Sequence, residues 1–430
     1  MAISSLLNRK GMFMLPAGCR SVLLQAFHEG SRASYNSTAS FVRIVSTSTR
    51  RPSRTIINNS FAKTPFVRPF KNGAVILARQ SSSIQSPAIP IQEESKTVLE
   101  PYSPPKTGLL SVLPPSWVPY AELCRLDKPT GSYYLYAPCL FSTLLAAPLA
   151  VPMASPLSVL GTSLLFFSGA LIMRGAGCAI NDLWDRNLDP HVARTRLRPI
   201  ARGAITPFNA LAFTGVQLLA GLAILLQFPA QCFFYAVPSL LLVTIYPLAK
   251  RVTYYPQFVL GLTFSWGAIM GFPALGIDLI HHSAALASAG LLYTSNIAWT
   301  VLYDMIYAHM DIKDDAKAGI KSIALKHDAQ TKQVLSGLAV VQIGLLAAAG
   351  AAAGAGPVFF IGSCGGGALT LAYMIKKVNL KSVEDCWWWF VNGCLITGGV
   401  ISAGLAGDYA VRYIWADEED SNKIVLAEKE

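Results

Sequence analysis

Charged side chains are scarce in this sequence. Only 14% of its 430 residues are Asp, Glu, Lys or Arg, whereas 53% are hydrophobic. Soluble globular domains carry about 25% charged residues, so this composition excludes an ordinary soluble enzyme. The sequence therefore predicts a protein that crosses the membrane several times and has the lipid bilayer as a partner.

Acidic residues are almost absent from the first 90 residues, where Glu29 stands against twelve Lys and Arg residues. The rest of the chain has 23 bases and 23 acids, so the net charge of +11 resides in this leader. No basic face is left over, and we expect no nucleic-acid partner. A leader rich in Arg and Ser is typical of an organellar transit peptide, most simply a mitochondrial one, with a plastid one as the alternative. A secretory signal is a further alternative, but Arg20 interrupts its apolar run.

Two common site motifs are also missing. The eight cysteines form no CxxC pair and lie mostly within apolar stretches, which predicts buried thiols and neither disulfides nor zinc ligands. There is no Walker-type glycine-rich loop that would hold a phosphate. Any phosphate site must therefore be built from other residues.

Composition divides the chain into four predicted parts, namely a transit leader, a linker, a membrane domain and an acidic tail, at residues 1–85, 86–115, 116–410 and 411–430. The linker is rich in Pro and Ser and is expected to be extended. The membrane domain opens with an amphipathic segment, 116–128, which predicts an interfacial helix that ends at Pro129.

Apolar runs of about 20 residues, the length that crosses the hydrocarbon core of a bilayer, recur along the membrane domain. Nine such runs lie near residues 131–153, 157–180, 208–228, 231–249, 257–276, 284–303, 333–353, 357–375 and 387–406. We therefore predict an all-α fold with nine transmembrane helices.

Lys and Arg are missing from every second connection between these runs, for example from 154–156 and 276–283. Under the positive-inside rule, all basic connections then lie on one face of the membrane. An even number of predicted spans separates the two clusters of acidic residues in the domain. Both clusters are therefore expected on the same face, where they can form one site.

The first acidic cluster contains Asn181, Asp185 and Asp189, which fall on one face of a continuous helix because their spacing is four residues. Asp304, Asp311 and Asp315 repeat this alignment if their helix continues. An amide oxygen and several carboxylates suit Mg²⁺, a hard cation that prefers oxygen ligands and usually binds substrate phosphates as well as the protein. The alternative for any of these acids is a solvated loop position or a charge near a helix terminus. Three acids, Asp182, Asp314 and Asp328, do not align with either set, and for them this alternative is as good as a role in the site.

Arg174 lies inside the second predicted span, where an unpaired cation costs at least about 2.5 kcal/mol. It could form a structural ion pair with another helix or bind a carboxylate or phosphate of the substrate, and its depth in the membrane favours the substrate. Most other bases on this side are expected to contact lipid headgroups. Candidates to bind a diphosphate are Arg186, Lys250 and Arg251.

At these residues the sequence closely resembles the UbiA superfamily of intramembrane aromatic prenyltransferases. The matching motifs, in order, are Arg125–Pro129 with Gly131, Gly175–Asp189 in the form NDxxDxxxD, Arg194-Thr195 with Arg198-Pro199, Tyr303-Asp304 with Tyr307-Ala308, Asp311 and Asp315, and Gly319–Ser322. The resemblance covers roughly residues 120–410 and implies a nine-helix bundle. It also implies Mg²⁺ on a polyprenyl diphosphate, held by Asn181, Asp185, Asp189, Asp311 and Asp315, with these four aspartates as catalytic residues.

Within the superfamily, the details most resemble the branch that prenylates 4-hydroxybenzoate in ubiquinone synthesis. That resemblance implies attack by the ring carbon ortho to the hydroxyl on an allylic cation, with the acceptor carboxylate against Arg174. It also implies the mitochondrial inner membrane, a site on the matrix side, and association with other enzymes of ubiquinone synthesis. The alternatives are another branch that uses haem or homogentisate, an unrelated membrane phosphotransferase, and a transporter, although no half-to-half repeat is visible.

Overall fold

The computed structural model describes residues 102–187, 189–191, 195–312 and 321–427. The predicted transit leader, most of the predicted linker, and Asp314 and Asp315 lie outside these residues. From Ser103 onward the described residues belong to one compact unit.

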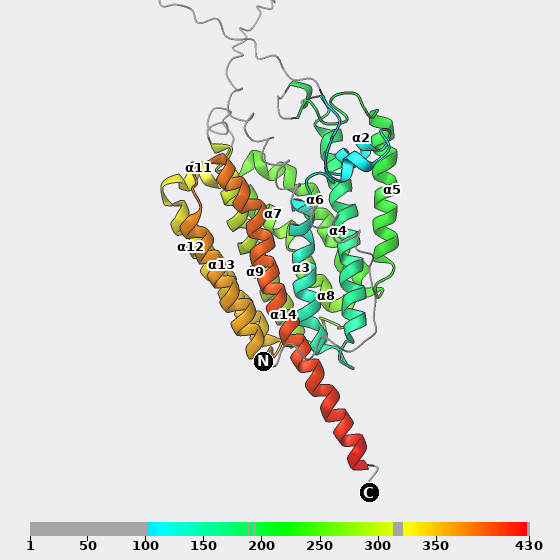
Figure 1. The fold of residues 1–430 in the computed structure, drawn as a ribbon, viewed down its shortest axis with the longest axis vertical. Helices are drawn as coiled ribbons and strands as arrows, with labels where there is room; N and C mark the ends of the chain where they lie inside the picture. Colours follow the sequence, from blue (N-terminus) through cyan, green and yellow to red (C-terminus); the bar gives the residue numbers. More distant parts are fainter. Residues whose placement is uncertain (1–101, 188, 192–194, 313–320, 428–430) are drawn as a thin grey trace, which may run out of the picture. The chain divides into compact units, whose positions relative to one another are not determined.

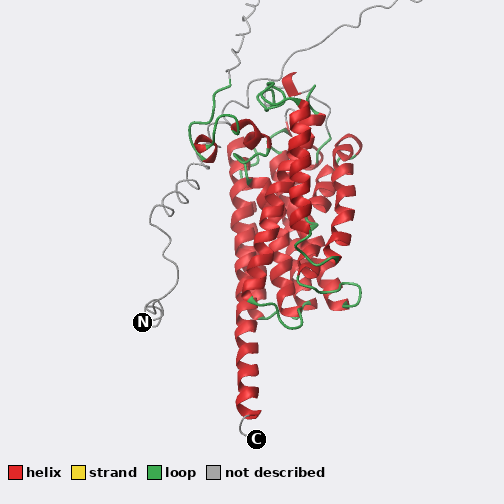
Figure 2. Cartoon of the chain, turned by 90° about the vertical axis from the view of Figure 1, so that its right-hand side faces the viewer, coloured by secondary structure: helices red, strands yellow, loops and turns green. Residues whose placement is uncertain are grey.

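Every regular element of the described residues is a helix, which confirms the all-α prediction (Figures 1 and 2). In chain order the main helices are α2 (Val118–Leu123), α3 (Thr130–Ala146), α4 (Pro156–Trp184), α5 (Pro207–Leu225), α6 (Gln231–Val252), α7 (Pro256–Phe264), α8 (Gly267–Ala274), α9 (Ser283–Ala308), α11 (Ile323–His327), α12 (Thr331–Ala352), the π-helix η6 (Phe359–Gly365), α13 (Gly366–Lys377) and α14 (Val383–Ala427). Helices satisfy their own backbone hydrogen bonds, which a bilayer requires of a spanning segment.

Six helical segments are long and apolar enough to cross a membrane. They are Pro156–Trp184, Pro207–Leu225, Ser283–Ala308, Ile323–Ala352, Phe359–Lys377 and Val383–Ala416. The other predicted spans are also helical, but α3 has only 17 residues and the fifth is divided between α7 and α8. The count of nine membrane crossings therefore stays a prediction.

A serine of α3 is hydrogen-bonded to the first turn of α8, just after the break between α7 and α8. Ser142 Oγ donates to the carbonyl oxygen of Gly267 at 2.8 Å and accepts from the amide of Gly271 at 3.0 Å. A Cβ atom on Gly271 would overlap the backbone of α3, so α3 and α8 can pack this closely only because the residue is glycine. Polar groups in broken membrane helices are commonly satisfied by such side chains.

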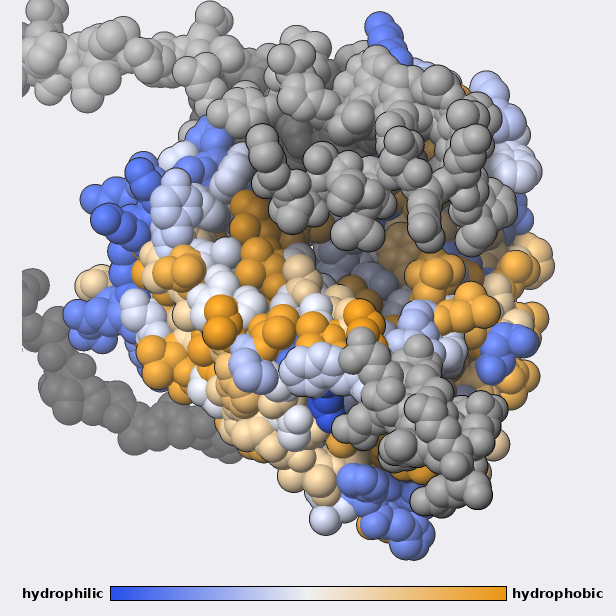
Figure 3. All heavy atoms as spheres, turned by 60° about the horizontal axis from the view of Figure 1, so that its bottom comes forward, coloured by the Kyte–Doolittle hydropathy of each residue, from blue (hydrophilic) through white to orange (hydrophobic). Residues whose placement is uncertain are grey.

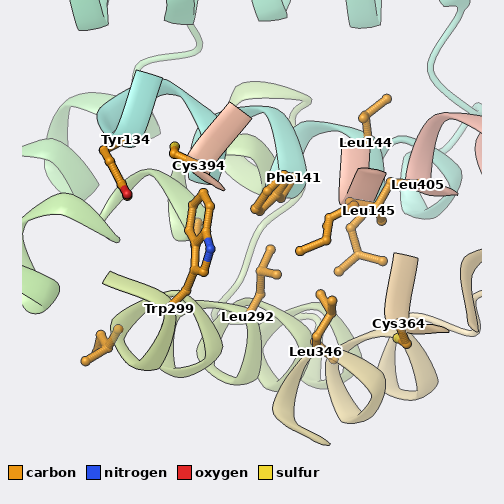
Figure 4. Close-up of a cluster of buried hydrophobic side chains, with 14 of the residues drawn as sticks. Tyr134, Phe141, Leu144, Leu145, Leu292, Trp299, Leu346, Cys364, Cys394 and Leu405 are labelled. Carbon is orange, nitrogen blue, oxygen red and sulfur yellow. The ribbon is translucent and has the colours of Figure 1, made fainter. Parts of the chain in front are cut away.

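The largest cluster of buried side chains joins α3, α9, α12 and α14 (Figure 4). Trp299 and Tyr303 of α9 are completely buried, and the Trp299 ring packs against those of Tyr134 and Phe141 from α3. Other apolar side chains remain exposed, and orange residues appear on the face shown in Figure 3. Exposed apolar side chains on long helices are what a lipid-facing surface needs.

The helices at the two ends of the predicted membrane domain have other bounds than predicted. The interfacial helix ends at Leu123, and Pro129 instead lies at the N-cap of α3. At the other end, α14 continues through the predicted acidic tail as far as Ala427 and extends beyond the bundle (Figure 2). No Gly or Pro follows Gly407, so nothing in the sequence interrupts the helix there. The predicted linker is not extended throughout, because Leu109–Val112 form a 3₁₀ helix that buries Leu110.

Candidate active site

The first acidic cluster lies where α4 ends. The helix stops at Trp184, Asp185 is its C-cap residue, and Asp189 begins a 3₁₀ helix, Asp189–His191. The prediction of one continuous helix through Asp189 is therefore wrong. Helix-like backbone hydrogen bonds nevertheless join residues four apart. The Asp185 amide donates to the Asn181 carbonyl at 3.0 Å, and the Asp189 amide donates to the Asp185 carbonyl at 2.9 Å. Asn181 Nδ2 also donates to Asp185 Oδ2 at 3.2 Å.

Asp182 is the most buried carboxylate of this cluster, with a side chain that is 0% exposed. Arg125 donates from one guanidinium nitrogen to both Asp182 oxygens, at 2.7 and 2.9 Å. Arg198 lies 3.2 Å from the same carboxylate and donates to both oxygens of Asp189, at 3.0 and 3.2 Å. Asp182 is thus a buried ion-pair partner, and its interpretation as a solvated loop acid is wrong.

Arg125 reaches Asp182 from an unusual backbone conformation. Its φ of 58° is the only positive value among the described residues other than glycine. The left-handed region costs an ordinary residue about 1 kcal/mol or more, so contacts of the side chain must hold it there. Burial opposes the charge of the guanidinium, but the Asp182 carboxylate outweighs burial and raises the pKa of Arg125. Arg125 is therefore charged at every physiological pH.

We expect Arg125→Gln to lower the free energy of unfolding by about 2 kcal/mol, less than for a fully isolated buried charge because Arg198 still pairs with Asp182. Thermal unfolding of the purified protein in detergent measures the change. In an Asp182→Asn background the same substitution should cost clearly less, because the carboxylate is gone. Equal losses in both backgrounds would show that the ion pair does not stabilise the fold.

Arg174 is partly buried on α4 and packs against the first turn of α3. A Cβ atom on Gly131 would overlap its guanidinium, so this contact depends on glycine. Among the residues that the structure describes, no hydrogen bond or salt bridge of Arg174 is found. The alternative of a structural ion pair therefore has no support in the described part of the chain.

The second acidic cluster follows α9. This helix ends at Ala308, and Asp311 lies in the next turn with its amide donating to the Ala308 carbonyl at 3.3 Å. The condition for a helical alignment of Asp304 with Asp311, a helix that continues, is therefore not met, and Asp315 is outside the described residues. The turn is attached to α12, because the buried ring of His309 is hydrogen-bonded to Thr331 at 2.8 Å. Burial lowers the pKa of His309, which favours its neutral form.

Both clusters lie at the same end of the bundle, as predicted (Figure 1). The first turns of α3 connect them. Gly131 packs against Arg174 of α4, and the ring of Tyr134 lies 5.9 Å from that of Tyr303 near the end of α9. Helix α3 thus contacts both α4 and α9, the helices that lead into the two clusters.

The other predicted bases are placed differently. Arg186 is exposed, donates to the Leu183 carbonyl at 3.3 Å, and lines a shallow groove with Phe208 of α5. Unlike Arg125 and Arg198, it forms no salt bridge with Asp182 or Asp189. Lys250 and Arg251 lie in the last turn of α6, but their side chains are outside the description.

Sequence reasoning missed the structural roles of Asp182, Arg125 and Arg198. All three belong to the motifs that carry the family resemblance, and that was the available signal. Spacing could not find the pairing, because Arg125 and Asp182 are 57 residues apart in the chain.

The acidic residues fit a hard divalent cation by their chemistry. Asn181, Asp185 and Asp189 each have a side-chain oxygen that can bind a metal, and Asn181 and Asp185 lie close enough to share a hydrogen bond. In the described part of the chain, no three His, Cys, Asp or Glu side chains already surround one point. Mg²⁺ does not need such a cage, because it is usually bound by one or two carboxylates together with water and substrate phosphates.

Comparison with known proteins adds to this geometry. The model of the UbiA prenyltransferase family matches residues 135–396. The mitochondrial 4-hydroxybenzoate polyprenyltransferase of Schizosaccharomyces pombe is 45% identical over 310 residues, 72% of this chain and 85% of that protein. The protein of the same description from Saccharomyces cerevisiae is 45% identical and covers 70% and 79%, and that from Rattus norvegicus is 44% identical and covers 67% and 76%. A UbiA homologue from Aeropyrum pernix K1 shares the fold, with a TM-score of 0.52 and 22% identity over 65% of this chain and 97% of that one.

Proposed function

Because the chain belongs to the UbiA prenyltransferase family, we propose that it transfers a polyprenyl group from polyprenyl diphosphate to the ring of 4-hydroxybenzoate. The observation that carries this proposal is the 45% identity with relatives of that activity, which extends over 85% of one relative's length. The bond between the allylic carbon and the diphosphate breaks, and the ring carbon ortho to the hydroxyl forms a new bond to the allylic carbon. The ring then loses its proton to a base in the site, either an aspartate or the released diphosphate.

Asn181, Asp185, Asp189, Asp311 and Asp315 are the proposed ligands of Mg²⁺. When bound, the ion neutralises negative charge on the departing diphosphate. The described members of this set come from the ends of α4 and α9, which lie at one end of the bundle. Arg186, Lys250 and Arg251 remain candidates for further contacts with the diphosphate, with Arg186 outside the buried ion-pair network.

Arg174 is the proposed partner of the acceptor's carboxylate. Its guanidinium lies against Gly131 of α3, one helical turn before Tyr134 in the same helix. A charge-assisted hydrogen bond to the carboxylate would orient the ring, and a pocket walled by apolar helices would exclude water. Exclusion of water protects the allylic cation from hydrolysis.

We further propose that the protein resides in the mitochondrial inner membrane with this end of the bundle on the matrix side. The support is the basic leader, the relatives named as mitochondrial, and the bases that gather in the connections at this end. Association with other enzymes of ubiquinone synthesis is a natural extension for an enzyme with such lipid-soluble products.

The test is incubation of membranes that contain the protein with 4-hydroxybenzoate, an allylic diphosphate and Mg²⁺. We expect a prenylated product that disappears when EDTA removes the metal and returns when Mg²⁺ is restored. Homogentisate and haem as acceptors test the other branches of the superfamily. Uptake of solute into proteoliposomes without consumption of diphosphate would contradict the enzyme and favour a transporter.

A further inference from the structure

The guanidinium of Arg198 is shared between two carboxylates. One of its nitrogens lies 3.2 Å from Asp182 and 3.0 Å from Asp189. The Asp182 side chain is 0% exposed, that of Asp189 is 7% exposed, and that of Arg198 is 22% exposed. With Arg125 on the other side of Asp182, two acids and two bases form a neutral network largely shielded from water.

The two carboxylates depend on Arg198 to different degrees. Asp182 has Arg125 as a second partner and stays paired if Arg198 moves. Within the described residues, the only cation paired with Asp189 is Arg198. The backbone of Asp189 is fixed independently, because its carbonyl accepts from Thr195 Oγ1 at 3.1 Å and its amide donates to the Asp185 carbonyl. The Asp189 side chain can therefore exchange its partner without a change in the backbone.

This arrangement creates a competition at Asp189, if that residue is a metal ligand as the proposed function requires. The Asp189 oxygens that accept hydrogen bonds from the Arg198 guanidinium cannot also bind a divalent cation at full strength. We propose that Arg198 is an exchangeable counter-ion, which neutralises Asp189 while no metal is bound and remains attached to Asp182 when the metal takes its place. A shielded carboxylate without any counter-ion is strongly disfavoured, so the exchange keeps Asp189 paired in both states.

Binding of Mn²⁺ alone to the purified full chain in detergent, measured by electron paramagnetic resonance without diphosphate, tests the exchange. We expect Arg198→Gln to lower the dissociation constant for Mn²⁺ about tenfold, because a charge-assisted hydrogen bond no longer competes for Asp189. Arg198→Lys retains the competing charge and should stay within about threefold of the wild type. Arg202→Gln is the matched control, because Arg202 belongs to the same loop but pairs with Glu122, and it should leave Mn²⁺ binding unchanged.

Asp182→Asn should act in the opposite direction. Arg198 then loses its second carboxylate and relies on Asp189, so the dissociation constant for Mn²⁺ should rise several-fold. An Arg198→Gln protein that binds Mn²⁺ no more tightly than the wild type, or that binds none, overturns the exchange.

Asp189→Asn separates this inference from the function on which it rests. If this variant binds Mn²⁺ more weakly while Arg198→Gln has no effect, only the exchange fails. If Asp189→Asn leaves Mn²⁺ binding unchanged, Asp189 is not a ligand, and the metal assignment in the proposed function fails with it.

Discussion

Asp185→Asn is expected to reduce kcat for prenyl transfer about a thousandfold, because an amide oxygen replaces a charged oxygen proposed to hold the metal beside the departing diphosphate. The substitution preserves the shape of the side chain, so the end of α4 and its hydrogen bond from Asn181 should change little. Rates of product formation at saturating substrates, with equal amounts of protein in the membranes, measure the effect.

Asp278→Asn is the matched control for this prediction. Asp278 follows α8 at the other end of the bundle, where its carboxylate accepts from the Ile280 amide and pairs with His281. This variant should retain its activity, whereas Asp311→Asn should lose activity as Asp185→Asn does. Near-normal turnover in either Asp185→Asn or Asp311→Asn would refute the metal assignment of that residue.

Arg174→Gln is expected to raise KM for 4-hydroxybenzoate roughly 10- to 100-fold, the loss that follows removal of a charge-assisted hydrogen bond to a carboxylate. The concentration of Mg²⁺ that gives half-maximal activity should not change, because Arg174 is proposed to contact the acceptor and not the metal. Arg174→Lys keeps the charge but lacks the paired donors of the planar guanidinium, so its KM for the acceptor should lie between those of the wild type and Arg174→Gln. Initial rates at varied acceptor and varied Mg²⁺ distinguish these effects.

A glycine pair provides an independent check on Arg174. Alanine at Gly131 would displace the intact guanidinium, and should raise KM for the acceptor in the same way. Alanine at Gly177, on α4, meets no atom within 4 Å and should behave as the wild type. A Gly131→Ala enzyme with normal KM, or an Arg174→Gln enzyme that instead requires more Mg²⁺, would contradict the role given to Arg174.

The helical architecture was largely predictable because it follows from local composition. Runs of about 20 apolar residues must cross the bilayer as helices, which satisfy their own backbone groups. The structure confirms helices in all these runs and has α4 and α9 end at the same end of the bundle, as the alternation of basic connections predicted. The division of the fifth run into α7 and α8 was not predicted, and the contact of Ser142 with the start of α8 could not be, because the two residues are 125 positions apart.

The candidate site was predictable in its residue types but not in its geometry. Periodicity aligned Asp185 with Asp189 and Asp304 with Asp311, yet α4 ends at Trp184 and α9 at Ala308. A helical pattern predicts which residues share a face only as far as the helix extends. Composition likewise could not distinguish Asp182 from its neighbours, although it is the most deeply buried acid of the cluster.

Sequence alone determined that this chain is an all-α membrane protein of the UbiA family and which acids and bases gather at one end of it, because hydropathy, charge and motif order are local properties of the chain. The tertiary structure decided which of those charges are paired. Asp182 and Arg125 meet across 57 residues, Arg198 joins Asp182 to Asp189, and in the described part of the chain Arg174 shows no such partner. Whether a charge is neutralised inside the protein or remains available to a ligand depends on distances of about 3 Å between side chains, and only the packing of the helices sets those distances.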